Sequence, residues 1–284
     1  TPCLVLDLDA LREIHSDLSI LNMRVTPLMV GGTVYVVTPL RLSAAIDAGT
    51  GEVRWVHDPD LIRSTKHSIN APGYSSRGLA YWADENGNDE RLFYGTPDGY
   101  LLAIDAKTGK ACPSFGDNGE VQMPTSMPQI WPGEVIATSN PTVVNDVVVV
   151  GSAVADNQRV DAPSGRVMAY DARTGEFRWS FDPVPRDPSD PASASWEKGS
   201  GEGFGGGNVW STMAADQDLD LVYLPTTSST SDFYGGDRAG DILVRRPQHG
   251  PVLIHQRRIA IGRNHRVGQG LGARGKGDRA AQDR

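Results

Sequence analysis

Side chains of types that bind charged or aromatic ligands stand at four places in the sequence. Arg77 can pair with an anion, and Trp210 can offer a flat ring for stacking. Thr138 carries a hydroxyl, and Asp156 and Asn157 carry the oxygen atoms that Ca²⁺ and Mg²⁺ prefer. Each type also has an ordinary structural use, in a surface loop, a turn or the packing between sheets. Whether they form a site depends on the elements that position them.

An internal repeat predicts those elements. The pattern Ala-x-Asp-x-x-Thr-Gly occurs three times, with its Asp residues 58 and then 66 positions apart. The copies are residues 45–51, 103–109 and 169–175. In each copy the Asp side chain can accept hydrogen bonds from turn amides, and the Gly supplies the positive φ that closes the turn. Trp55 and Trp179 then start a strand and can bury a large apolar area between sheets, whereas the second copy has Pro113 there.

Strand patterns upstream of each turn complete the repeat. They cover residues 34–37, 92–94, 100–104, 143–144 and 147–150. Four short strands per repeat, arranged radially, make the blades of an all-β propeller. The long repeat spacing predicts inserted loops on one face, where function is expected to reside. By itself the repeat indicates a scaffold and no chemistry.

Four sequence blocks between Thr26 and Arg238 are more specific. They are Arg77-Gly78-Leu79-Ala80-Tyr81-Trp82, Tyr94-Gly95-Thr96-Pro97-Asp98-Gly99, Val150-Gly151-Ser152 and Trp210-Ser211-Thr212-Met213. In their order and spacing the chain resembles the PQQ-dependent dehydrogenases, or quinoproteins, and within them the membrane-bound glucose and quinate type. The resemblance implies an eight-bladed propeller with pyrroloquinoline quinone (PQQ) on its axis. This chain would supply about half of it, a partial ring of roughly three to four blades.

The same resemblance implies roles for the residues named above. PQQ is a flat tricyclic ortho-quinone with three carboxylates, so it needs cations, an aromatic platform and a metal. By position, Arg77 matches an arginine that pairs with a cofactor carboxylate, Thr138 a threonine that bonds the cofactor, and Trp210 the floor beneath its rings. Asp156, with Asn157, matches the metal position, where Ca²⁺ or Mg²⁺ would polarise the quinone carbonyl. Glycines before Trp210 are expected to let the backbone approach closely.

Four departures from the family pattern accompany this resemblance. No catalytic residue can be nominated, because the family's aspartate base belongs to a block beyond the point, near Asp241, where the resemblance ends. Arg24 stands where many relatives have an acidic or amide side chain, and Ser228 stands where many have a metal-binding Asn. The alcohol dehydrogenase branch has adjacent cysteines where this chain has residues 73–76, Gly-Tyr-Ser-Ser. Their absence favours the glucose or quinate branch.

Composition divides the chain into three parts. With 39% apolar residues and no apolar run of about 18 residues, we expect a soluble globular chain with no signal or transmembrane segment of its own. Residues 1–24 are an uncertain segment with a hint of a short helix, and residues 25–241 are the partial PQQ-binding propeller. Residues 242–284 carry a net charge of +8 and no aromatic residue, against −16 for the rest. We expect this tail to be disordered or out of frame, with nucleic-acid or anionic-lipid binding as the alternative.

The resemblance also implies a function. It is the PQQ-dependent oxidation of CH–OH groups of sugars or cyclic polyols, with ubiquinone as electron acceptor, at the periplasmic face of the inner membrane in a full-length parent. We expect the present chain to be a catalytically incomplete fragment, with no nucleic-acid partner. A non-enzymatic propeller that presents loops to protein partners is the alternative.

Overall fold

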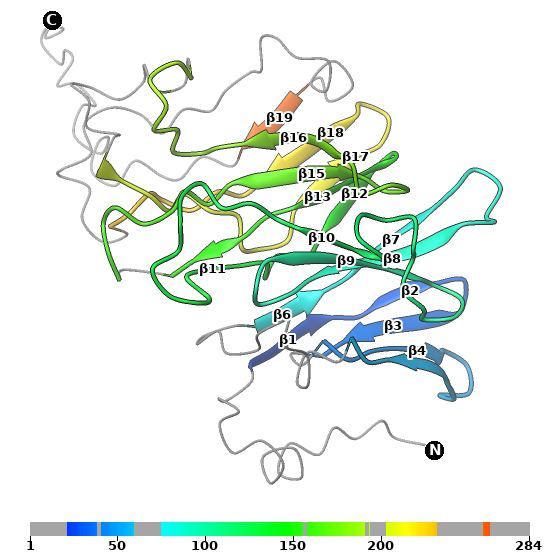
Figure 1. Cartoon of the computed structure of the whole chain (residues 1–284). Helices are drawn as coiled ribbons and strands as arrows, with labels where there is room; N and C mark the ends of the chain where they lie inside the picture. Colours follow the sequence, from blue (N-terminus) through cyan, green and yellow to red (C-terminus); the bar gives the residue numbers. More distant parts are fainter. Residues whose placement is uncertain are drawn as a thin grey trace, which may run out of the picture.

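The computed structural model describes a fold made almost entirely of β-strands, as predicted (Figure 1). It describes residues 22–38, 41–59, 75–155, 158–190, 193, 203–231 and 258–261. The short helix expected near the N-terminus and most of the basic tail lie outside these residues. Within the described parts of the chain, no helix is long and apolar enough to cross a membrane.

Three four-stranded antiparallel sheets form successive blades. The first blade contains β2 (Leu28–Val30), β3 (Thr33–Val37), β4 (Ser43–Asp47) and β5 (Val53–His57). The second contains β7 (Ala80–Ala83), β8 (Glu90–Gly95), β9 (Tyr100–Asp105) and β10 (Glu120–Gln122). The third contains β12 (Thr142–Val144), β13 (Val147–Val150), β15 (Val167–Asp171) and β16 (Phe177–Phe181). Strands follow chain order from one edge of each sheet to the other, as in a propeller blade.

Shorter sheets surround these blades. A fourth blade begins with β17 (Ala214–Asp216) and β18 (Leu221–Leu224). Strand β19 (Arg258–Ile261), from the basic tail, pairs parallel to β18, unlike the antiparallel ladders of the complete blades. Two ribbons join neighbouring loops: β1 (Asn22–Thr26) lies parallel to β6 (Ser75–Gly78), and β11 (Val135–Ile136) lies antiparallel to β14 (Ala153–Val154).

The repeated turns have the predicted geometry. In the first copy Asp47 Oδ1 accepts hydrogen bonds from the amides of Gly49 and Thr50, at 2.9 and 2.8 Å, and the other copies repeat this contact. The closing glycines have φ of 76°, 70° and 72°. Trp55 follows the first turn and donates its indole N–H to the carbonyl of Ala106 in the second blade, at 3.0 Å. The turn therefore also delivers the side chain that joins two blades.

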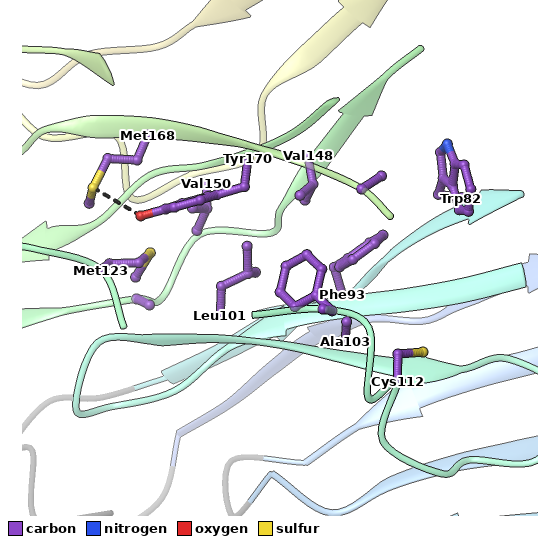
Figure 2. Close-up of a cluster of buried hydrophobic side chains, with 13 residues drawn as sticks. Trp82, Phe93, Leu101, Ala103, Cys112, Met123, Val148, Val150, Met168 and Tyr170 are labelled. Carbon is purple, nitrogen blue, oxygen red and sulfur yellow. Dashed lines mark hydrogen bonds between the residues drawn. The ribbon is translucent and has the colours of Figure 1, made fainter. Parts of the chain in front are cut away.

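Apolar side chains fill the space between adjacent blades. Figure 2 shows the cluster between the second and third blades, where Phe93 and Leu101 meet Val148 and Tyr170. The Tyr170 hydroxyl donates to Met168 Sδ at 3.4 Å. Similar clusters lie on either side, between the first and second blades and between the third and fourth. Stacking of sheets is thus what orders the blades around the ring.

Antiparallel connections sort the loops into two groups. The repeated turns, and the turns between the first two strands of each blade, lie together at one end of the sheets. The second-to-third-strand loops and the blade-to-blade connections lie at the opposite end, here called the loop end, which carries β11 in Figure 1. The longest of them are residues 58–79, 123–141, 151–166 and 182–213. The described parts of the inserted loops expected from the repeat spacing therefore share one face.

Candidate functional site

The predicted cofactor residues all lie at the loop end. Arg77 is on β6, in the connection between the first and second blades. Thr138 lies in the connection that precedes the third blade, and Trp210 in the connection that precedes the fourth. Asp156 and Asn157, the predicted metal ligands, belong to the 151–166 loop but lie outside the described residues.

Arg77 and Trp210 are brought into direct contact. The guanidinium carbon of Arg77 lies 4.4 Å from the centre of the Trp210 ring, which is within the range of a cation–π interaction. Trp210 remains 38% exposed, so that part of its indole is available to a ligand. Two connections that are distant in sequence therefore place a cation over one face of an aromatic ring.

The Arg77 guanidinium also has unused hydrogen-bonding capacity. Its Nε is buried and has no acceptor among the residues that the structure describes. Burial, followed by repulsion from Arg24, lowers the pKa of Arg77 from its usual value. A buried donor without an acceptor is costly, and an anion would satisfy it. Arg24, an exposed residue that departs from the family pattern, thus adds positive potential at this position.

The glycines that precede Trp210 let their backbone pack closely against neighbouring loops. Gly206 and Gly207 have φ of 70° and 68°, and a Cβ atom at Gly207 would lie 2.8 Å from Val184. The Gly207 amide donates to the carbonyl of Ser228 at 3.0 Å. Ser228, at the place of the expected metal-binding Asn, therefore contributes its main chain to this support.

A second set of contacts closes a circuit around the site. Gly78 packs against Asn140, because a Cβ atom at Gly78 would lie 2.8 Å from Asn140 Oδ1. Ser139 Oγ accepts the Gly151 amide hydrogen at 2.9 Å. A Cβ atom at Gly151 would lie 2.2 Å from the carbonyl oxygen of Val209. These contacts link four connections in turn, within residues 58–79, 123–141, 151–166 and 182–213. The contact between Arg77 and Trp210 links the first of them to the last and closes the circuit.

Thr138 is buried within this circuit. It exposes 4% of its surface and precedes Ser139 directly. The neighbouring Asn140 Oδ1 is also buried and accepts no hydrogen bond from the described residues. Polar atoms of this loop are thus withdrawn from water beside the Arg77 strand.

Several residues at the site were not among the sequence-based candidates. Asn208 donates its side-chain amide to the carbonyl of Ser152 at 3.1 Å and accepts a hydrogen bond from the Thr227 hydroxyl at 3.0 Å. It therefore joins the 151–166 loop to the support of Trp210. Its position between Gly207 and Trp210 was the available signal, but asparagine is also an ordinary turn residue.

A cavity of about 620 Å³ lies beside this circuit, between loops of the second and third blades. Its lining includes Ala137 and Ser152, which adjoin the site, and three methionines, Met123, Met127 and Met168. Among the described residues there is no group of three or more His, Cys, Asp or Glu side chains able to hold a metal. The metal assignment therefore stays a prediction carried by Asp156 and Asn157.

The described residues suit a flat aromatic polycarboxylate. Arg77 offers a partner for a carboxylate, with an Nε that lacks an acceptor, and Trp210 offers a surface for a ring system. The hydroxyl-bearing loop at Thr138 lies in the same circuit. This donor set matches the chemistry of PQQ.

Comparison with known proteins identifies the family. The PQQ family model for the glucose/ethanol/alcohol dehydrogenase β-propeller domain matches residues 9–243. The chain is 34% identical to quinoprotein glucose dehydrogenase A of Acinetobacter calcoaceticus and 32% identical to the quinate/shikimate dehydrogenase (quinone) of Acinetobacter baylyi. Each alignment covers 76% of this chain and 28% of the relative, so the chain spans little more than a quarter of their length.

Solved structures give the same result. The quinohemoprotein alcohol dehydrogenase ADHIIG of Pseudomonas putida HK5 superposes with a TM-score of 0.55 at 29% identity, over 73% of this chain and 29% of that one. The quinohemoprotein alcohol dehydrogenase of Comamonas testosteroni superposes with a TM-score of 0.53 at 30% identity, over 74% and 30% of the two chains. Because the family model covers most of the sequence and the β-blades agree with it, this chain belongs to the family of PQQ-dependent dehydrogenases and contains part of its β-propeller.

Proposed function

We propose that this chain forms one side of the PQQ site of a dehydrogenase that oxidises CH–OH groups of sugars or cyclic polyols. The observation that carries the proposal is the Arg77 guanidinium, 4.4 Å from the Trp210 ring centre and with a buried Nε that has no acceptor among the described residues. The guanidinium covers one face of the indole, and a flat anion can pair with Arg77 while lying against the exposed part of Trp210.

Each residue has a distinct proposed role. Arg77 binds a carboxylate of the cofactor, Trp210 supports its ring system, and the Thr138 hydroxyl forms a hydrogen bond to it. Asp156 and Asn157 supply oxygen ligands to Ca²⁺ or Mg²⁺. When bound, PQQ supplies the two-electron acceptor for alcohol oxidation, and the divalent cation polarises its quinone carbonyl. No residue of this chain is assigned the role of the base that takes the substrate hydroxyl proton.

The substrate and the electron acceptor are proposed from chemistry shared with relatives. Glucose, quinate and shikimate appear in the names of relatives with 32–34% identity, and all three carry secondary ring hydroxyls or a hemiacetal. We therefore propose a sugar or cyclic polyol as the substrate and ubiquinone as the acceptor. The proposed location is the periplasmic face of the inner membrane.

Equilibrium dialysis tests the proposal with the 284-residue chain itself. The chain should retain PQQ, and retention should rise when Ca²⁺ or Mg²⁺ is added. Replacing Arg77 with Ala should weaken retention by about tenfold, since a charge-assisted hydrogen bond is lost. If the folded chain retains no more PQQ than a chamber without protein, the non-enzymatic scaffold is favoured.

A turnover assay tests the absence of the base separately. The PQQ-loaded chain, given glucose or quinate and a ubiquinone analogue, should not reduce the acceptor above the rate of free PQQ. Steady turnover by the purified chain would show that it contains a base and would refute this part of the proposal.

A further inference from the structure

A buried carboxylate outside the PQQ circuit joins two loops of the loop end. Glu134 exposes 1% of its surface. One carboxylate oxygen, Oε2, accepts the amide hydrogen of Ile130 at 2.8 Å. The other, Oε1, accepts a hydrogen bond from Arg159 Nε at 2.6 Å. Because a buried charge is stable only when it is paired and hydrogen-bonded, these contacts hold the carboxylate in one position.

The main chain of the same residue makes a third contact. The carbonyl oxygen of Glu134 accepts the amide hydrogen of Ala155 at 2.8 Å. The residues that follow Glu134 form β11, which pairs with β14 through Val135 with Val154 and Ile136 with Ala153. Glu134 thus continues a short antiparallel ribbon and adds a side-chain anchor beyond its end.

The positions of these contacts along the chain are informative. Ala155 directly precedes Asp156, and Arg159 stands two residues after Asn157. Glu134 therefore binds the backbone amide of Ala155, just before the predicted metal-ligand pair, and the side chain of Arg159, just after it. The hydrogen bond that Arg159 donates to Glu134 also raises the pKa of Arg159.

We infer that Glu134 is a positioning residue for the metal site, fixing the two flanks of the Asp156–Asn157 pair. The inference rests on the proposed function, because that proposal assigns the metal to this pair. Residues that orient metal ligands from behind contribute to affinity without touching the ion, because they remove alternative arrangements of the ligand.

Two variants and a matched control test this role. Glu134→Gln keeps the shape of the side chain but removes the charge that binds Arg159. Arg159→Lys keeps the positive charge but replaces the planar guanidinium. Asp171→Asn serves as the control, because Asp171 is also a buried carboxylate paired with an arginine, Arg178 at 2.5 Å, but lies at the opposite end of the sheets.

The first measurement is Ca²⁺ affinity by isothermal titration in the presence of PQQ. Glu134→Gln and Arg159→Lys should each bind Ca²⁺ about 10–100-fold more weakly than the wild type. The Asp171→Asn control should stay within about twofold of the wild type. The second measurement is hydrogen exchange without metal, where both variants should speed exchange in a peptide covering residues 153–160 and the control should not.

The outcomes separate the two proposals. If the wild-type chain binds Ca²⁺ and both variants bind it with the same affinity as the wild type, the role of Glu134 is overturned and the proposed function stays intact. Faster exchange without any change in Ca²⁺ affinity would overturn it as well, since Glu134 would then be a structural anchor alone. A wild-type chain that binds PQQ but no Ca²⁺ would overturn the metal assignment and the positioning role together.

Discussion

At the scale of single residues, the candidate site depends on two side chains with complementary properties. Arg77 is a cation whose buried Nε has no acceptor among the described residues, and Trp210 is an aromatic ring that keeps more than a third of its surface exposed. A second arginine–tryptophan pair exists at the opposite end of the sheets, where Arg173 lies 4.8 Å from the Trp82 ring centre. That pair has a carboxylate, because Asp146 bonds both the Trp82 indole and Arg173. The pair at the loop end has the open anion position.

This difference predicts how two tryptophan substitutions behave. Trp210→Leu should weaken PQQ binding by about tenfold, because a stacking surface worth roughly 1 kcal/mol or more is lost. Trp82→Leu should lower the thermal stability of the chain, since Trp82 is buried, but should leave PQQ affinity unchanged. Fluorescence titration with PQQ, at a temperature where both variants are folded, measures the two affinities. Equal losses in both variants would contradict the assignment of Trp210.

Residue types could be predicted from the sequence better than their partners could. Arg77 and Trp210 were nominated from specific sequence blocks, and the structure brings the two side chains into contact, while their roles toward a cofactor stay predictions. The contact of Ser139 with Gly151, and that of Asn208 with Ser152, could not be predicted, because serine and asparagine occur in many turns. Their partners are set by the packing of loops from different blades, which no local pattern describes.

At the scale of elements, the repeated turn is both a local motif and a contact between blades. Gly109 closes the second copy with φ of 70°, and a Cβ atom there would lie 2.6 Å from the ring of Trp55 in the first blade. Gly87, in another turn of the second blade, has φ of 66° but nothing within 4 Å of such an atom. The two glycines share a backbone conformation and differ only in their neighbours.

Alanine at each glycine separates these effects. Gly87→Ala should cost about 1 kcal/mol from the left-handed conformation alone. Gly109→Ala should cost about 1–3 kcal/mol more, because the methyl group displaces a packed indole. Urea unfolding of the two variants gives the comparison. Equal costs would mean that Trp55 does not press on this turn.

The turn carboxylates predict a dependence on pH. Burial raises the pKa of Asp171, but hydrogen bonds from Arg178 and from the turn residues Arg173 and Thr174 outweigh it, so the folded-state pKa lies below its usual value. The stabilisation is therefore complete above the unfolded-state pKa of about 3.9 and is lost as pH falls through the lower folded-state value. Asp171→Asn should cost about 1–3 kcal/mol at pH 7 and less below about pH 4.

Asp47 provides the matched control for that experiment. It makes the same turn contacts and pairs with Arg54, but its side chain is more exposed than that of Asp171. Asp47→Asn should therefore destabilise the chain less at pH 7. Urea unfolding at pH 7 and below about pH 4 measures the stability of the wild type, Asp171→Asn and Asp47→Asn. A larger loss of stability in Asp47→Asn than in Asp171→Asn would show that burial does not set the strength of these ion pairs.

Strands could be predicted from the sequence where the hydrophobic pattern was local and strong. Strands β3, β8, β9, β12 and β13 lie where alternating or continuous apolar runs predicted them. The ribbons β1–β6 and β11–β14 could not be predicted, because each strand is short and gains its stability from a partner far along the chain. These ribbons support the site, so its framework was the less predictable part.

At the scale of the whole molecule, the outer face of the first blade is apolar and open. Across β2 to β5, Met29, Val34, Ile46 and Val53 are in register in one row, with Val56 in the next. Met29, Val53 and Val56 are 66%, 41% and 54% exposed. The opposite face of the same sheet is covered by the second blade. An exposed apolar sheet face of this kind favours association.

This face predicts self-association of the isolated chain. The double variant Met29→Glu with Val56→Glu should weaken association by about tenfold or more, because burying each of these side chains is worth roughly 1.5–3 kcal/mol. Leu219→Glu, which changes an isolated leucine that is 55% exposed, should have little effect. Sedimentation velocity over a concentration series measures both. Equal behaviour of the two variants would show that this face is not the contact.

The most direct test of the central claim is a crystal structure of the chain soaked with PQQ and Ca²⁺. The account predicts electron density for PQQ at the loop end, with a carboxylate bound by Arg77 and its rings against the Trp210 indole. Density for PQQ elsewhere, such as in the methionine-lined cavity, or a folded chain with no PQQ at the Arg77–Trp210 pair, would contradict it.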